Sequence, residues 1–168
     1  MNLIVGILSD THLPARGKQL PETLLERFRG ADLILHAGDW LSMDVYETLS
    51  ALAPVEGVAG NGDGDDIVRR FGKKKLLELA GIRVGLVHGH EGPGRTTPER
   101  AFAAFRVEKP DLVVFGHSHI PYLSEAEGTL LFNPGSPTDK RRQPRYSFGI
   151  LTIRNGQFSV EHCYFDKP

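Results

Sequence analysis

Residues 3–12 read LIVGILSDTH, an unbroken apolar run that ends in an Asp-Thr-His triplet. A continuous apolar run is typical of a strand buried on both faces, as in a parallel sheet covered by helices. Two further segments repeat the pattern, LILHAGD at residues 33–39 and VEGVAGN at residues 55–61. The chain therefore begins with three predicted buried strands, each followed by side chains that can bind metals.

Helical patterns lie between these strands. Residues 21–29 have helical spacing with a proline at the start, and Ser42 is placed to cap a helix that runs to about Leu52. A third helix is expected to begin near Ile67. Three strand–loop–helix units in succession predict parallel pairing with right-handed crossovers.

The second half of the chain is mostly β. Residues 74–79 and 82–87 predict a hairpin, residues 90–98 a loop rich in glycine and proline, and residues 99–105 a helix. The remaining predicted strands are residues 112–115, 122–126, 129–132, 146–153 and 157–162. These elements predict an α/β fold, a two-sheet β-sandwich flanked by helices, in a single domain of residues 1–168.

The composition excludes several classes of protein. With 168 residues, 40% hydrophobic and 24% charged, the chain is typical of a globular protein, and its net charge of −1 argues against an extended nucleic-acid surface. The single cysteine, Cys163, excludes an intrachain disulfide. Residues 1–8 lack a basic segment, so they predict a strand and not a signal peptide, and no apolar run approaches the ~20 residues that span a membrane. We therefore expect a cytoplasmic protein that does not enter a membrane.

The polar residues after the strands form one predicted metal site. Its candidate ligands are Asp10, His12, Asp39, Asn61, His88, His117 and His119. In an open α/β sheet, ligands bind beyond the carboxyl ends of the strands. Residues two apart on extended backbone point the same way, so Asp10 with His12, and His117 with His119, can share a site. Seven oxygen and nitrogen ligands exceed the needs of one metal, and a two-metal site suits in-line displacement at phosphorus.

These motifs, Asp-x-His, Gly-Asp, Gly-Asn, His-Gly and Gly-His-x-His in this order, resemble those of the calcineurin-like metallophosphoesterases. The short length, the Gly-Asn-x-Asp pattern at residues 60–63, the His-Gly-His at residues 88–90 and the Asn-Pro-Gly-Ser at residues 133–136 resemble the small bacterial and archaeal phosphodiesterase branch. The resemblance implies a four-layer αββα architecture. It also implies hydrolysis of a phosphoester by a metal-bound water or hydroxide.

The resemblance further implies how the ligands divide between two divalent metal ions. Asp10, His12 and His119 would hold the first ion, Asn61, His88 and His117 the second, and Asp39 would bridge them. Manganese is the expected metal, with iron, nickel or zinc as alternatives, since the ligand set favours first-row metals over calcium.

One position departs from the family pattern. Many members carry a histidine directly after the motif asparagine, where it assists the leaving group or binds phosphate, but this chain has Gly62. We therefore predict a small phosphodiester as substrate, because diesters with a good leaving group need less proton transfer than monoesters. Asp39 and Asn61 are predicted catalytic residues, and His90 is a candidate general acid.

Other functions compete with this reading. The same fold resembles the retromer scaffold subunit of eukaryotes, which has a degraded site and binds partner proteins. A phosphomonoesterase or a nuclease is a further alternative. The presence of a competent ligand at all seven positions favours an enzyme. The family resemblance is compatible with a homodimer, and the sequence does not fix the oligomeric state.

Several residues have both a structural and a functional interpretation. Lys140, Arg141, Arg142 and Arg145 could meet a substrate phosphate or form an exposed loop. Asp63, Asp65 and Asp66 are expected to cap the helix near Ile67, with support of the metal ligands as the alternative for Asp63. Trp40 could line the pocket or close the core. Packing or structural roles are expected for His36, His162 and Cys163. The lysines at residues 73–75 are expected to lie on a solvated strand edge, where their charge discourages aggregation.

Overall fold

The first predicted strand forms β1 (Leu3–Leu8), which lies inside a five-stranded sheet. The computed structural model describes residues 2–17 and 19–167, so Met1, Lys18 and Pro168 of the predicted domain lie outside the described residues. β1 pairs in parallel with β2 (Leu33–His36), and β2 pairs in parallel with β3 (Val55–Gly57), as predicted. Antiparallel β9 (Tyr146–Arg154) and β10 (Gln157–Phe165) complete the order β10-β9-β1-β2-β3.

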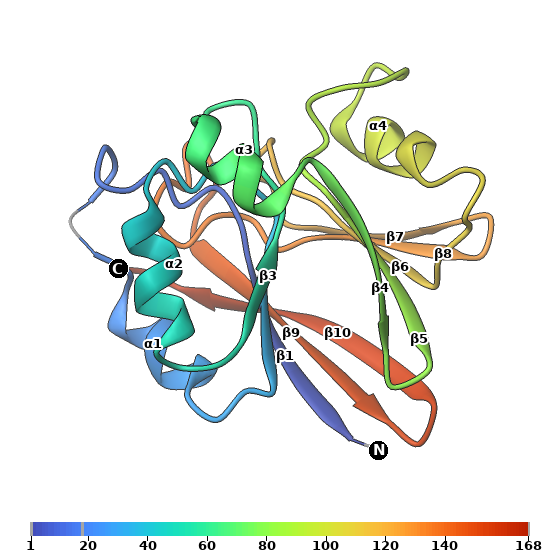
Figure 1. Ribbon diagram of the computed structural model, residues 1–168, viewed down its shortest axis with the longest axis horizontal. Helices are drawn as coiled ribbons and strands as arrows, with labels where there is room; N and C mark the ends of the chain where they lie inside the picture. The colour runs from blue at the N-terminus through green and yellow to red at the C-terminus, as the bar shows by residue number, and fades with distance from the viewer. Residues whose placement is uncertain (1, 18, 168) are drawn as a thin grey trace.

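The second sheet has the order β4-β5-β6-β8-β7 (Figure 1). Its strands are β4 (Lys74–Leu79), β5 (Ile82–Val87), β6 (Leu112–Val114), β7 (Tyr122–Ala126) and β8 (Thr129–Asn133). β5, β6 and β8 are parallel neighbours, and the hairpins β4–β5 and β7–β8 supply the antiparallel edges. Both sheets therefore contain parallel strands that can deliver ligands at their carboxyl ends.

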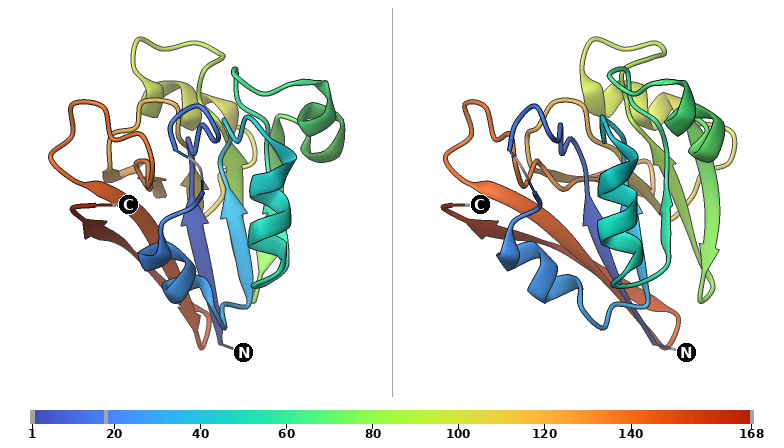
Figure 2. Two further views of the ribbon diagram at one scale, coloured as in Figure 1. Left: turned by 90° about the vertical axis from the view of Figure 1, so that its left-hand side faces the viewer. Right: turned by 60° about the vertical axis from the view of Figure 1, so that its left-hand side comes forward.

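Helices cover the outer faces of both sheets (Figure 2). They are α1 (Glu22–Phe28), α2 (Met43–Ser50), α3 (Asp65–Phe71) and α4 (Thr97–Ala104). Buried side chains form three layers: between the first sheet and α1–α3, between the two sheets, and between the second sheet and α4. On β2, Ile34 enters the layer under the helices and Leu35 enters the layer between the sheets. The predicted α/β sandwich is confirmed, and no helix of the described residues is long and apolar enough to cross a membrane.

A glycine in each sheet lets an aromatic ring lie directly on a strand. A Cβ at Gly6 would lie 2.7 Å from the ring of Phe28, and one at Gly85 would lie 2.9 Å from the ring of Phe105. Real Cβ contacts are longer, and protein interiors leave little free space for a shift. These glycines therefore set how closely α1 and the end of α4 approach the sheets.

Helix α4 begins two residues before the predicted start at residue 99. Thr96 caps this helix, because its side chain accepts a hydrogen bond from the amide of Glu99 at 3.3 Å. Pro98 then lies in the first turn, where a missing N–H leaves no helical hydrogen bond unmade. The prolines that predict a loop are thus compatible with a helix start.

Helix α3 begins at Asp65, before the expected start near Ile67. Gly64 precedes it without a side-chain cap, so the expectation that Asp63 caps this helix is wrong. Asp65 and Asp66 lie in the first turn of α3, where their negative charges interact favourably with the helix dipole.

The lysine-rich strand β4 is an edge strand, as its charge predicts. Lys74 pairs with Glu108 at 2.9 Å. Lys75 pairs at the same distance with Glu56 of β3, which links the edges of the two sheets.

Candidate metal centre

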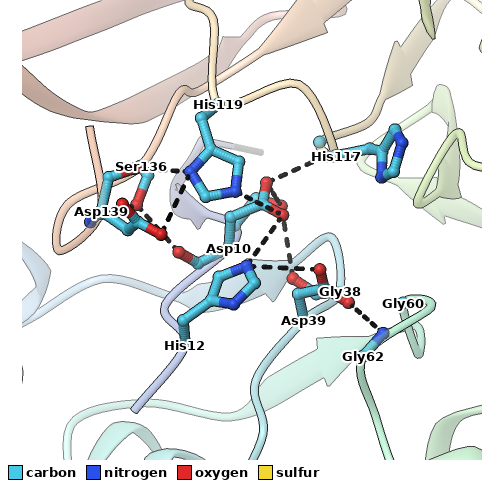
Figure 3. A network of polar contacts seen from close by, with 12 residues as sticks. Asp10, His12, Gly38, Asp39, Gly60, Gly62, His117, His119, Ser136 and Asp139 are labelled. Carbon is cyan, nitrogen blue, oxygen red and sulfur yellow. Dashed lines mark hydrogen bonds and ion pairs between the residues drawn. The ribbon is translucent and has the colours of Figure 1, made fainter. Parts of the chain in front are cut away.

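The seven predicted ligands meet where the parallel strands of both sheets end. Those of the first sheet follow β1 (Asp10, His12), β2 (Asp39) and β3 (Asn61). Those of the second sheet follow β5 (His88) and β6 (His117, His119). The two sets are tied directly, because the amide of His117 donates to Asp10 Oδ2 at 2.9 Å (Figure 3).

Asp10 is buried and uses its two oxygens differently. Oδ2 accepts hydrogen bonds from Ser9 Oγ at 2.8 Å and from the amide of His117. Oδ1 faces the Nε2 atoms of His12, His88 and His119 at 3.8, 3.7 and 3.6 Å. Oδ2 is therefore held in place by the protein, and Oδ1 points into a cluster of imidazoles.

Asp39 has the same division of roles. Its Oδ1 accepts from the amide of Gly62 at 2.8 Å. Its Oδ2 lies 3.3 Å from His12 Nε2 and 3.4 Å from His88 Nε2. One oxygen of Asp39 thus lies between a ligand predicted for the first metal and a ligand predicted for the second.

Asn61 and His117 lie together on the solvent side of the cluster. Asn61 Oδ1 is 3.2 Å from His117 Nδ1, and the His117 ring is edge-on to that of His88 with centroids 5.2 Å apart. Asn61 is exposed and His117 is half-buried, whereas His88 is fully buried. The site therefore opens to solvent beside the residues assigned to the second metal.

Backbone carbonyls fix the orientation of two imidazoles. His88 Nδ1 donates to Ala37 O at 2.7 Å, and His119 Nδ1 donates to Asp139 O. Because a carbonyl can only accept, each Nδ1 carries the proton in the neutral ring and each Nε2 has a free lone pair. Metal-binding histidines are commonly oriented by such a bond from the other ring nitrogen.

Carboxylates and imidazoles shift the pKa values of one another. Burial lowers the pKa of His12, but close contacts with the carboxylates of Asp10 and Asp39 outweigh this effect and raise it to about 9. Burial raises the pKa of Asp39, but contacts with His12 and His88 hold it well below its usual range. A proton on His12 thus offsets buried negative charge, and a divalent cation can take the place of that proton.

Four buried polar atoms in the cluster have no hydrogen-bond partner among the described residues: Asp10 Oδ1, His12 Nε2, His88 Nε2 and His119 Nε2. Buried polar atoms are nearly always bonded, so convergent exceptions indicate a ligand. Two groups could each hold a cation, with ligand atoms within 4.8 Å of one another: Asp10, His12 and His119, and Asp10, Asp39 and His88. Carboxylate oxygens and imidazole nitrogens fit a divalent first-row metal.

Five of the seven residues have left-handed backbone: Asp10 (φ 57°), His12 (47°), Asp39 (62°), His117 (72°) and His119 (63°). The expectation that each pair two residues apart shares one side of an extended strand is therefore wrong, because tight turns place these side chains. Left-handed non-glycine residues cost on the order of 1–3 kcal/mol each and concentrate at functional sites.

Asp63 belongs to this site and not to α3. Its Oδ2 accepts from the amides of Asp39 and Gly60, and its Oδ1 accepts from the amide of Leu41, all at 2.8 Å. Burial raises the pKa of Asp63. The alternative that Asp63 supports the metal ligands through hydrogen bonds agrees with this geometry, and the Gly-Asn-x-Asp pattern is the signal that located it.

The Asn-Pro-Gly-Ser segment at residues 133–136, which stands out in the sequence only through the family resemblance, supports the ligand loops. Ser136 Oγ donates to Asp10 O at 2.8 Å, and Asn133 Nδ2 donates to Gly116 O at 3.0 Å. His162 of β10 donates through Nε2 to Asn133 O at 2.7 Å, in line with its predicted structural role. Cys163 packs partly buried against the core beneath the helices.

Two histidines outside the ligand set differ in role. His90 lies beside the second group, with its ring centroid 5.4 Å from that of His88 and 6.2 Å from that of His117. His36 stacks on Trp40 at 3.9 Å and accepts from the amide of Gly38 at 3.1 Å, so its predicted packing role is confirmed. Trp40 is fully buried and therefore closes the core.

The basic residues at 140–145 do not act as one group. Arg145 pairs with Asp166 at 2.9 Å, and Lys140 lies 5.7 Å from the ring centre of Tyr146. Arg141 is exposed, and its charge adds to the effect of burial in lowering the pKa of His119. A contact between Arg141 and a substrate phosphate stays a prediction.

Known proteins share both the sequence pattern and the fold. A probable metallophosphoesterase of Methanothermobacter thermautotrophicus is 40% identical over 143 residues, which cover 83% of this chain and 80% of the relative. An Entamoeba histolytica Vps29 in complex with Zn²⁺ superimposes with a TM-score of 0.76 at 24% identity, covering 98% of this chain and all of that chain. An archaeal phosphodiesterase gives a TM-score of 0.71 at 23% identity, over 96% of this chain and all of that one. At these identities the two structures show the fold alone.

A family model described as the calcineurin-like phosphoesterase superfamily domain matches residues 3–156. The match includes every predicted ligand and both sheets up to β9. Together with the 40% identity to the Methanothermobacter thermautotrophicus protein, this match establishes that the chain belongs to the calcineurin-like phosphoesterase superfamily.

Proposed function

We propose that this protein is a phosphodiesterase with a binuclear metal centre. Asp10, His12 and His119 would hold one divalent cation, Asn61, His88 and His117 the other, and Asp39 would bridge them. The observation that carries the proposal is the position of Asp39 Oδ2, 3.3 Å from His12 Nε2 and 3.4 Å from His88 Nε2. Two cations in such a site supply Lewis acidity to a phosphoryl oxygen and lower the pKa of water.

The residues of the chain orient the ligands and define the approach of substrate. Carbonyl oxygens hold His88 and His119 with their Nε2 atoms free, so ligand geometry is set before a cation binds. Asn61 is exposed, so a substrate phosphate would enter from its side. Arg141, exposed near His119, would attract an anionic substrate. These features suit a small phosphodiester.

The surroundings of Gly62 favour diesters over monoesters. No imidazole follows Asn61, and a Cβ at Gly62 would lie 3.1 Å from Leu41 Cδ2. His90 is the remaining candidate proton donor, but burial lowers its pKa. A neutral imidazole is a weak acid, so substrates that need a proton on the leaving group are disfavoured.

We propose Mn²⁺ as the bound metal, with iron, nickel or zinc as alternatives. The mixed set of carboxylate, amide and imidazole ligands supports a borderline first-row cation. Metal availability also selects among these ions.

The proposal is tested by stripping the protein of metal and reloading it with Mn²⁺. We expect two Mn²⁺ per chain, and faster turnover of bis-p-nitrophenyl phosphate than of p-nitrophenyl phosphate. Faster turnover of the monoester would contradict the diester preference. Two bound metals without hydrolysis of either compound would instead favour a binding protein of the same fold.

The scaffold alternative rests on the likeness to Vps29, which at 24% identity shows the fold alone. Four convergent buried atoms without partners among the described residues support a bound cation, and all seven ligands that the proposed enzyme needs are present. The intact ligand set therefore supports the enzyme.

A further inference from the structure

We infer that Asp63 is a positioning residue that fixes the bridging carboxylate before any cation binds, an inference that rests on the proposed binuclear centre. Its side chain is mostly shielded from solvent and accepts three backbone hydrogen bonds of 2.8 Å. The donors are the amides of Asp39, Leu41 and Gly60. All of them belong to the two loops that carry the predicted bridge and Asn61.

These bonds join segments that are distant in the sequence. Asp39 and Leu41 follow β2, whereas Gly60 and Asp63 follow β3, and the bonds from Asp39 and Leu41 span 24 and 22 residues. Hydrogen bonds to an ionised carboxylate are roughly twice as strong as neutral ones. Asp63 thus sets the distance between the loop of the bridging residue and the loop of Asn61.

The loop after β3 also holds the side chain of Asp39. The amide of Gly62 donates to Asp39 Oδ1 at 2.8 Å, while Asp63 Oδ2 binds the backbone amide of Asp39. A backbone bond from the amide of Asp63 to Gly60 O, 3.2 Å long, closes the turn that carries both contacts. Asp39 is therefore held at its amide and at one carboxylate oxygen, and only Oδ2 faces the imidazoles.

Two of the three residues that bind Asp63 are under backbone strain. Asp39 has φ 62° and Leu41 has φ 71°, both left-handed. Such conformations persist only where surrounding bonds require them. The carboxylate of Asp63 supplies these bonds by accepting from both strained amides, so it maintains the turn that aims Asp39 at the site.

The test compares Asp63→Asn with Asp66→Asn. Asparagine has the size of aspartate but turns one acceptor into an NH₂ group that faces a backbone donor, so at least one of the three bonds is lost. Asp66 is a matched control, because its carboxylate bonds to the amide of Ile67 at the start of α3. For Asp63→Asn we expect at least tenfold weaker binding of the second Mn²⁺, and loss of the exchange-coupled electron paramagnetic resonance signal of paired Mn²⁺. For Asp66→Asn we expect wild-type behaviour.

A merely structural role would lower the melting temperature without separating the two Mn²⁺ equivalents. Asp63→Asn protein that is folded and binds a coupled Mn²⁺ pair with wild-type affinity would overturn the inference while leaving the proposed function intact. Wild-type protein that binds one Mn²⁺, or none, would instead refute the binuclear centre itself.

Amide hydrogen exchange in metal-free wild-type protein tests the same inference without any variant. The amides of Asp39, Leu41 and Gly60 should be protected before metal is added. Rapid exchange at all three, with protection only after Mn²⁺ binds, would show that the cation and not Asp63 orders the loops.

Discussion

Replacing Gly60 with alanine should displace the bridging carboxylate by an amount that the structure defines. A Cβ at Gly60 would lie 2.2 Å from Asp39 Oδ1 and 2.6 Å from the Asp39 amide nitrogen, whereas real Cβ contacts are not shorter than 3.0 Å. The carboxylate must therefore move by at least 0.8 Å, the difference between 3.0 and 2.2 Å. Because the clash also involves backbone, rotation of the Asp39 side chain alone does not relieve it.

The energetic consequence has two parts. Overpacking of a filled site costs about 1–3 kcal/mol. Loss of the charged hydrogen bond from Gly62 to Asp39 Oδ1 costs about 1.5–3 kcal/mol. At about 2–4 °C per kcal/mol, the melting temperature should fall by about 5 °C or more. A misplacement near 1 Å at a reacting centre reduces turnover by about a hundredfold, so kcat/KM for bis-p-nitrophenyl phosphate should fall by that factor.

Gly64→Ala is the matched control, because its Cβ would lie 3.4 Å from Asp66 Oδ1, an ordinary contact. Neither Gly60 nor Gly64 has a left-handed backbone, so alanine causes no left-handed backbone strain at either position. The two substitutions differ in the contacts that the new Cβ makes. Calorimetric titration with Mn²⁺, thermal melting of the metal-free protein and diester turnover give three measurements. Wild-type Mn²⁺ affinity and turnover in Gly60→Ala would refute the reasoning.

Four further predictions follow from the same geometry. Asp39→Asn should remove the second Mn²⁺ equivalent and diester turnover, since a neutral amide lacks the negative charge that offsets the charge of two cations. A fully active variant would contradict the two-metal assignment. Gly62→His should raise the ratio of monoester to diester turnover once the neighbouring leucine shifts slightly, and an unchanged ratio would remove the reason for the diester preference. Arg141→Ala should weaken inhibition by inorganic phosphate several-fold. Arg145→Ala should not weaken it, because Arg145 is paired with Asp166. Equal effects of the two substitutions would contradict a role of Arg141 in anion binding. The pKa of His12 is raised from 6.5 to about 9, so its contribution to the stability of the metal-free protein is complete below pH 6.5 and lost as the pH rises through about 9. Thermal melts of wild-type and His12→Gln protein across this range should therefore converge at high pH, and parallel curves would exclude this linkage.

The fold could be predicted because its signals are local. The apolar run at residues 3–8 and its repeats in β2 and β3 identify buried parallel strands without knowledge of their neighbours. Strand order does not depend on local sequence. β9 lies between β10 and β1, although almost 140 residues separate it from β1 in the sequence. Only the packed layer between the sheets specifies that β1 and β9 are neighbours.

The ligand set could be predicted because strand ends meet at one edge of each sheet. The way the side chains reach the site could not, because the left-handed turns at Asp10 and His117 depend on hydrogen bonds from their amides to Gly38 O and to Asp10 Oδ2. The role of Asp63 was ambiguous for a similar reason. An aspartate just before a helix has the sequence signature of a cap, and only the position of the loop after β2 shows which amides it binds.

The ligands share one principle that no single position in the sequence reveals. Each of the carboxylates Asp10 and Asp39 commits one oxygen to protein donors and leaves the other facing the imidazoles. The histidines His88 and His119 likewise commit Nδ1 to a carbonyl and leave Nε2 free. Every such side chain is therefore oriented by the chain itself, so little ordering remains for a cation to impose. A substitution that frees the committed atom should weaken metal binding even where the ligand atom is retained, which is why the partners of these residues matter as much as the residues themselves.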